Sequence, residues 1–403
     1  MTARYRYVFA DLVSDRTIDE LDLADVKFDR RICQAGAFSA TLPVPNRAMA
    51  DRAARVVPRL DGDLSTGPGR TVMHVYRAGA LWGSYIIWSA TPESDDRGRV
   101  SIGLRGASLE SWLWHREIRT DITYDQTDQL EIARSLVFFA QEIPGQAGVS
   151  GADIGITFPL PPPESGILRD REYKASEAET YGKRLEQLSE VIDGPEWAIR
   201  TYTDASGERV REFVAEQQLG QGSTDHVFSQ PGNIIAWSYP ADATDAATSW
   251  QARGDTPNDD VAADSEPLLS DFWYSTRHLD SGWPLLERTE DYQSVTDIGT
   301  LNGYARWWAS RRSGMVRIPQ VTVRLDEHTS FSPNRIGDYA RLTLVNHWFP
   351  PLPDGSPTFR RTWRVIGVEV TPTSRADGQE RAKLIFEEPT DQPAGSLTGV
   401  TRA

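Results

Sequence analysis

The sequence predicts an α+β protein in which β-strands dominate. Short segments with a period of two, separated by Gly, Pro and Asp, fill residues 1 to about 110. From Ala107 to Gly194 the apolar residues follow the period of helices. A further helical segment, Thr300 to Arg312, then leads into another group of strands. We therefore expect two strand-rich regions with a helical region inserted between them.

The first strand-rich region is expected to form a small barrel or sandwich. Its clearest hairpin joins Arg70–Arg77 to Ala80–Ser89 through the short turn Ala78-Gly79. The strand Phe38–Leu42 is expected to be stopped by Pro43 and Pro45, because proline lacks the N–H that a ladder needs. The other predicted strands are Tyr5–Phe9, the alternating stretch from Ile18 to Ile32, Phe38–Leu42 and Arg99–Leu104.

Two full helices are predicted in the inserted region, after a helical turn at Ser108–Trp114. The first runs from Thr127, a suitable N-cap, to Gln141. The second runs from Glu177 to Asp193, where Ser176 and Glu179 have the spacing of a capping box. One face of this second helix carries Tyr181, Leu185, Leu188 and Ile192, and Gly194-Pro195 ends it.

The remainder of the chain is again rich in strands. A hairpin is predicted from Trp197–Tyr202 and Arg209–Val214, and the acidic stretch Gly254–Pro267 is expected to be an exposed loop. In the final helix, Leu301, Tyr304, Ala305 and Trp308 share one face. The other predicted strands are Asn233–Tyr239, Thr248–Arg253, Arg317–Leu325, Tyr339–Val345 and Thr362–Pro372.

Composition limits the classes of protein that this chain can belong to. Its 403 residues, 39% of them hydrophobic, suffice for two to four domains with cores of their own. No apolar run is long enough to cross a bilayer and no signal peptide is recognisable, so we expect synthesis in a cytoplasm and no stable membrane insertion. The net charge of −15 argues against specific nucleic-acid binding, but an acidic channel wall would let DNA pass without retaining it.

No residue pattern in the chain predicts catalysis, a cofactor or a metal. The single cysteine, Cys33, excludes an intramolecular disulfide and is expected to pack as a small buried residue. None of the six histidines has metal-ligand spacing with another, and adjacent acidic pairs are expected by chance among 58 acidic residues. Serine-hydrolase, P-loop and dinucleotide-binding motifs are absent from the sequence. We therefore predict that the protein is not an enzyme.

Tryptophan is abundant, with 13 residues scattered along the chain. Most lie in predicted strands or helices, where packing in a core is expected. Trp307 and Trp308 are adjacent on one helix and so point in different directions. One of them can face the core while the other faces a neighbouring subunit, which makes this pair a candidate interface.

Several segments resemble one family of viral structural proteins. They are ALWGSYIIWSA from Ala80, LRGASLESWLWHREI from Leu104, TLNGYARWWASRR from Thr300, and IGDYARL from Ile336 with RVIGVEV from Arg364. In this order and spacing they resemble the baseplate-hub and tail-associated minor tail proteins of long-tailed bacteriophages, in particular those that infect actinobacteria.

The resemblance implies a phage tail-hub-like fold with two β-barrel-like domains and a helical insert. Three subunits would form a ring of six barrels around a DNA channel at the tail tip of the virion, assembled in the host cytoplasm. The ring would contact tail-tube or distal tail proteins, the tape-measure protein and a fibre or spike. The expected domains are 1–106, a first barrel; 107–194, the helical insert; 195–299, a β-rich middle domain with the acidic loop; 300–390, a helix and second barrel; and 391–403, a polar tail.

Two other functions are compatible with the sequence. Its tryptophans and strands also suit a carbohydrate- or receptor-binding module of a tail tip. A wall hydrolase would need two carboxyl groups at a fixed separation across a cleft, which adjacent acidic residues do not provide.

Overall fold

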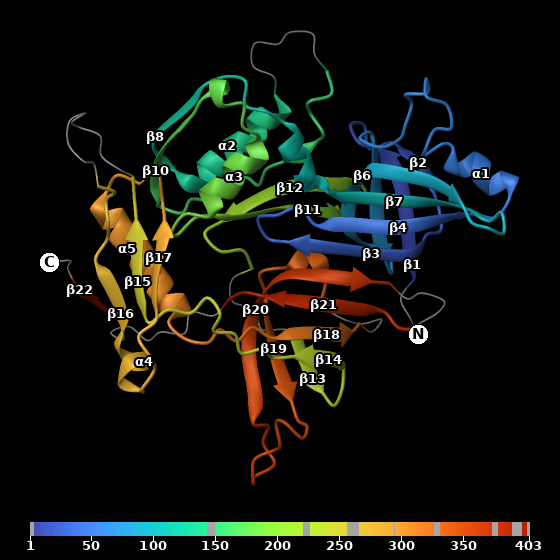
Figure 1. The fold of residues 1–403 in the computed structure, drawn as a ribbon. Coiled ribbons are helices and arrows are strands. Elements are labelled where there is room, and N and C mark those ends of the chain that lie inside the picture. The colour runs from blue at the N-terminus through green and yellow to red at the C-terminus, as the bar shows by residue number, and fades with distance from the viewer. Residues whose placement is uncertain are drawn as a thin grey trace. The chain divides into compact units, whose positions relative to one another are not determined.

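The computed structural model describes residues 4–142, 150–220, 226–255, 266–293, 295–325, 331–372, 378–388 and 397–400. Strands dominate and helices are few, as predicted (Figure 1). The chain divides into two compact units, each built from two separate stretches of sequence. Unit 1 comprises Met1–Ala236 and Val321–Ile385, and unit 2 comprises Trp237–Gln320 and Phe386–Ala403.

The N-terminal part of unit 1 is an antiparallel sheet in the order β2-β1-β5-β6-β7-β4-β3. Its elements are β1 (Tyr5–Asp11), β2 (Thr17–Glu20), β3 (Ala24–Arg31), β4 (Ala37–Val44), the short helix α1 (Arg47–Ala53), β5 (Thr71–Arg77), β6 (Ala80–Ser94) and β7 (Val100–Ser108). The hairpin at Ala78-Gly79 is confirmed. The prediction that Pro43 ends its strand is wrong, because β4 continues to Val44 with Pro43 opposite Ser101. Since β3 pairs with β4 only as far as Thr41, the proline lies beside a single neighbouring strand, a position that tolerates the missing N–H.

The helical insert begins with a 3-10 helix, η1 (Leu109–His115), where one helical turn was predicted. It continues through β8 (Ile122–Asp128), α2 (Gln129–Gln141), β9 (Ile156–Thr157), β10 (Leu168–Tyr173), the 3-10 helix η2 (Ala175–Glu177) and α3 (Tyr181–Ser189). Both long helices are present, but both predicted N-caps are wrong. Asp128, the last residue of β8, caps α2 by accepting from the N–H of Leu130 at 2.8 Å, so the cap lies one residue after the predicted Thr127.

The second capping error has a conformational cause. Ala178 adopts a left-handed backbone with φ of 51°, which separates Ser176 in η2 from the helix that follows. Thr180 caps α3 instead and accepts from the N–H of Lys183 at 3.2 Å. The helix ends at Ser189, so Ile192 lies beyond it.

One hydrophobic cluster joins the N-terminal sheet to the insert. The hairpin of β11 (Glu196–Thr203) and β12 (Arg209–Glu216) is confirmed and pairs with β9. Side chains of α2 and α3 pack with those of this hairpin and of the sheet in the cluster, which includes Ala10, Ile86, Leu136, Leu185, Trp197 and Phe213. The insert is therefore part of unit 1's core and not a separate appendage.

The C-terminal strands extend the same sheet. Strand β20 (Phe359–Thr371) pairs with β19 (Tyr339–Leu344) through its first residues and with β3 through Gly367–Val370. Beyond it lie β21 (Arg381–Phe386), β18 (Gln320–Arg324) and β14 (Ile234–Ser238), while β13 (His226–Gln230) pairs with β19. The strand order runs from β14 to β2, so closure into two barrels stays a prediction.

Unit 2 is a small sheet with one helix packed on it. Its strands β15 (Ser249–Arg253), β16 (Phe272–Ser275), β17 (Glu287–Asp291) and β22 (Leu397–Val400) lie in the order β17-β15-β16-β22, and its helices are α4 (Thr276–Asp280) and α5 (Ile298–Arg312). Helix α5 buries Leu301 and Ala305 as predicted, together with Ala309.

Two stretches of unit 2 were expected to be irregular. Most of the acidic loop, residues 256–265, lies outside the described residues. Leu397–Val400, expected in a polar tail, form an edge strand, because their backbone pairs with β16. Within the described ranges, no helix has both the length and the apolar character needed to span a bilayer.

Candidate functional site

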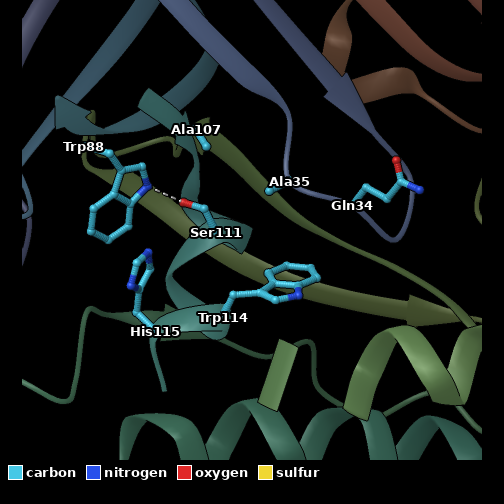
Figure 2. A pocket seen from close by; sticks show the side chains of 7 residues that line it. All are labelled: Gln34, Ala35, Trp88, Ala107, Ser111, Trp114 and His115. Atoms are coloured by element: carbon cyan, nitrogen blue, oxygen red, sulfur yellow. Dashed lines mark hydrogen bonds between the residues drawn. The ribbon is translucent and has the colours of Figure 1, made fainter. Parts of the chain in front are cut away.

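An open, aromatic-walled cleft lies in unit 1 where β6, β7 and η1 meet the turn between β3 and β4 (Figure 2). Its volume is about 370 Å³, within the range of about 300–1,000 Å³ typical of ligand pockets. We call it the aromatic cleft. It is lined by Gln34, Ala35, Trp88, Ala107, Ser111, Trp114 and His115.

Two irregularities of the backbone bring its walls together. The register of β6 against β7 shifts between Ile87 and Ser89 and skips Trp88. A bulge of this kind turns a side chain away from the direction that regular alternation would give it. In η1, Ser111 and Trp114 are three residues apart and therefore lie on the same side of the 3-10 helix.

The polar atoms of one wall are already used within the protein. The Trp88 Nε1–H donates to Ser111 Oγ at 2.9 Å, and the rings of Trp88 and His115 lie 4.1 Å apart at 31°. These contacts fix the orientation of the Trp88 ring. They also occupy the polar groups of Trp88 and Ser111, which share this wall with His115 (Figure 2).

Trp114 is held from behind by close packing. Gly182 of α3 lies so near its ring that a Cβ at this glycine would be 2.4 Å from Trp114 Cδ2. The Trp197 ring lies 6.2 Å away on the neighbouring hairpin. Trp114 is therefore a rigid wall, and the cleft is preformed.

The lining suits an apolar or aromatic group better than a sugar. Sugar-binding sites combine an aromatic platform with several polar side chains that bind hydroxyls. Of the lining side chains, Gln34, Trp114 and His115 carry polar groups that these contacts leave available, because the indole N–H of Trp88 and the Ser111 hydroxyl bond to each other. Among the residues that the structure describes, no group of three or more His, Cys, Asp or Glu could hold a metal ion.

The two tryptophans of the candidate interface, Trp307 and Trp308, lie in unit 2. The Trp308 ring stacks on Trp250 with centroids 5.4 Å apart, and its Nε1–H donates to Tyr292 Oη at 2.7 Å. Trp307 meets Trp308 edge-on at 4.8 Å, and the Arg311 guanidinium lies 4.6 Å from its ring. Trp308 thus packs against the hydrophobic cluster around Trp250 and Ala309. An intermolecular role for this pair stays a prediction.

Comparison with known proteins identifies a shared fold. No family model matches the chain, and no curated protein matches it in sequence. A tail protein from Neisseria meningitidis MC58 superposes with a TM-score of 0.56 at 12% identity, over 94% of this chain and 96% of that one. The 43 kDa tail protein of prophage MuSo2 from Shewanella oneidensis gives 0.58 at 9% identity, over 95% and 98%. The fold is that of phage tail proteins.

A third solved structure with this fold is larger. A chain of the lidded Francisella PdpA–VgrG complex matches all of this chain with a TM-score of 0.51 at 8% identity, and 55% of that chain is covered. The shared fold therefore occurs both in tail proteins of similar length and within a longer chain. The actinobacterial type expected from the sequence stays a proposal.

The aromatic cleft was not predicted, although its walls lie in two segments of the tail-protein resemblance. Trp88 lies near the end of one segment, and Trp114 and His115 lie in the next. The bulge at Trp88 and the 3-10 geometry of η1 bring them together, and alternation of residues does not reveal a bulge. Cys33 precedes Gln34 in the turn and is half-buried against the hydrophobic cluster of unit 1, where full burial was expected; burial of its thiol raises the pKa to about 12.

Proposed function

We propose that the protein is a non-enzymatic structural component of a phage-type tail that acts as a trimeric hub at the tail tip. The observation that carries the proposal is the end-to-end match with tail proteins, which covers at least 94% of both chains in two solved structures. A likeness confined to one common domain would not account for both units.

The hub would join the six-fold tail tube or distal tail ring to a three-fold tip, with the tape-measure protein and a fibre or spike as further partners. The sheet of unit 1 supports this role, because β20 joins the N-terminal and C-terminal strands into one body that could present related surfaces to a ring. The net charge of −15 would keep DNA from adhering to the channel wall.

Native mass determination and negative-stain electron microscopy test the proposal. We expect a three-fold ring with a central hole and a mass near three 45.0 kDa chains, alone or after addition of the tail-tube or distal tail protein. A compact monomer that stays monomeric with both partners would contradict the hub. Chains that assemble with another symmetry would contradict the trimer alone.

The carbohydrate-binding alternative has one structural feature in its favour, the tryptophan walls of the aromatic cleft. The few polar groups available there argue against it. We expect soluble wall polysaccharides to leave the tryptophan fluorescence unchanged. Saturable quenching that the variant His115→Ala abolishes would instead establish sugar binding in the cleft.

A further inference from the structure

The connection between β19 and β20 presents apolar side chains to solvent. Trp348 is 77% exposed and Leu352 is 47% exposed, although both are large and hydrophobic. Pro350, Pro351 and Pro353 lie among them. We call residues 346–353 the proline loop. It lies at the far end of the β19–β20 hairpin, which projects from the sheet of unit 1 (Figure 1).

This loop is held in one conformation by its own polar groups. Asn346 Oδ1 accepts from the N–H groups of Trp348 and Phe349 at 2.9 and 3.0 Å, and Asn346 Nδ2 donates to Gln230 Oε1 at 3.0 Å. At the other end of the loop, the N–H of Leu352 donates to the carbonyl of Ser356 at 2.8 Å.

The two aromatic side chains of the loop have different positions: one packs on the hairpin and the other is exposed to solvent. The Phe349 ring packs on Phe359 with centroids 4.7 Å apart and anchors the loop to the hairpin. Trp348, the residue before Phe349, points to solvent. A rigid loop loses little conformational entropy when it binds, so an exposed tryptophan on such a support indicates a docking element.

The aromatic cleft has the chemistry that such a loop requires. Proline-rich segments dock in grooves lined by aromatic side chains, because the proline rings stack on the aromatic faces. The cleft offers the rigid faces of Trp88 and Trp114 and few polar groups that would have to be desolvated. Every copy of this chain therefore carries both an exposed hydrophobic loop and an open cleft with aromatic walls.

We propose that the proline loop of one copy docks in the aromatic cleft of a second copy, with Trp348 as its anchor. Loop and cleft are different surfaces, so the contact is heterologous and repeats from copy to copy until a ring closes. The closure at three copies rests on the proposed hub, whereas the loop-and-cleft contact itself does not.

Two variants separate the two sides of the contact. Trp348→Ala removes the anchor from an exposed position, and Ala35→Glu places a charge in the cleft. The matched control is Leu160→Ala, since Leu160 is 87% exposed and also lies between prolines but belongs to a different loop. Sedimentation velocity of the full chain measures self-association, and thermal melts verify that each variant is folded.

We expect each cleft or loop variant to weaken self-association at least tenfold and the control to leave it unchanged. An equal mixture of Trp348→Ala and Ala35→Glu should form a heterodimer and stop there, because each mixed pair retains only one intact loop and one intact cleft. Should Ala35→Glu lower the Tm, His115→Ala removes an exposed part of the wall instead.

Three results would overturn the docking proposal. The first is wild-type protein that stays monomeric up to about 100 µM, where interfaces with micromolar Kd are occupied. The second is a set of variants that associate as the wild type does. The third is a mixture that assembles no better than either variant alone. A ring that forms despite both substitutions would leave the hub intact and refute only this contact.

Discussion

The interactions that stabilise unit 1 differ from those that stabilise unit 2. Unit 1 joins segments that are distant in sequence through buried ion pairs. Arg77 and Glu380, 303 positions apart, form a pair at 2.7 Å with side chains 4% and 1% exposed. Unit 2 has exposed ion pairs, such as Arg253 with Asp291, and centres on stacked rings, such as Trp250 on Trp308.

This difference predicts different weaknesses. A buried charge that loses its partner costs several kcal/mol, so unit 1 should be sensitive to single charge removals. Exposed pairs contribute about 0–1 kcal/mol, so unit 2 should tolerate the same change and respond to the loss of an aromatic ring. Four experiments test the contrast, from the largest expected effect to the smallest.

Removal of the Asp15 charge should destabilise unit 1 most. Asp15 accepts from His74 at 3.0 Å, Arg209 at 2.6 Å and Arg211 at 2.7 Å, and Arg211 is only 5% exposed. The substitution Asp15→Asn keeps a residue that tolerates its φ of 53°. We expect a loss of about 3–5 kcal/mol in the free energy of unfolding, measured by urea titration.

The matched control for Asp15 is Glu20→Gln. Glu20 pairs with Arg6, and their side chains are 42% and 46% exposed. Its loss should cost at most about 1 kcal/mol. Equal losses for Asp15→Asn and Glu20→Gln would show that the buried network contributes no more than a surface pair.

In unit 2, Trp308→Ala should cost more than Trp307→Ala. A fully buried tryptophan truncated to alanine costs about 3–5 kcal/mol, and half-buried Trp308 should lose about 2–3. Trp307 makes fewer contacts within unit 2, so its alanine variant should melt nearly as the wild type does. Under the interface proposal, Trp307→Ala should still impair assembly, as measured by native mass.

If both tryptophan variants unfold to the same extent in circular-dichroism melts, both are core residues and the interface proposal is wrong. If Trp307→Ala assembles normally, Trp307 faces no subunit. Either result would leave the contrast between the two units intact.

Acid should weaken unit 1 through His74. Burial lowers the pKa of His74, with Asp15 opposing the effect, so the imidazole is neutral in the folded protein. The unfolded chain binds a proton near its ordinary pKa of about 6.5, and folding stability therefore falls as the pH drops below that value. We expect a loss of about 1–2 kcal/mol between pH 7 and 5, since one proton accounts for at most about 1.4 kcal/mol per pH unit.

The variant His74→Gln should flatten this pH dependence in urea titrations. Asp15 does not interfere in the same window. Burial alone would raise the pKa of its carboxyl, but hydrogen bonds from His74 and Arg209 and the charge of Arg211 lower it well below its ordinary value. Its contribution is lost only below about pH 4, the pKa of an unfolded aspartate. An unchanged slope in His74→Gln would assign the acid sensitivity to other groups.

The smallest expected effect is a change in the rate at which a reagent labels the Cys33 thiol, and this rate reports on unit 1 alone. Cys33 is the single cysteine and lies in unit 1, and burial raises the pKa of its thiol to about 12. A thiol reagent at pH 8 should therefore react slowly with the folded protein. Trp308→Ala should leave this rate unchanged, whereas Asp15→Asn should raise it. Faster labelling in Trp308→Ala would show that unit 2 supports unit 1.

Local features of the fold were predictable from the sequence. The hairpins at Ala78-Gly79 and between β11 and β12 follow from alternation and turn residues, and α5 follows from its apolar face. The capping residues were not predictable in the same way, because Thr127 and Asp128 are both good caps and both lie in β8 directly before the helix.

Features that depend on distant segments could not be predicted. The pairing of β3 with β20 and the network of Ser84, His74 and Asp15 join residues with no periodic relation in sequence. The aromatic cleft depends on the bulge at Trp88. The tryptophan pair of α5 was found because adjacency on a helix is a local property.

The pairing of β20 with β3 also constrains the order of events on the ribosome. Strand β3 is synthesised early, but its partner residues Gly367–Val370 emerge only when most of the chain has been made. Until then the outer edge of β3 exposes unpaired backbone groups to any neighbouring nascent chain. Unit 2 is completed later still, since β22 begins at Leu397. A truncated chain that lacks Gly367–Val370 therefore retains this open edge, and we expect it to associate with other chains in a non-native way.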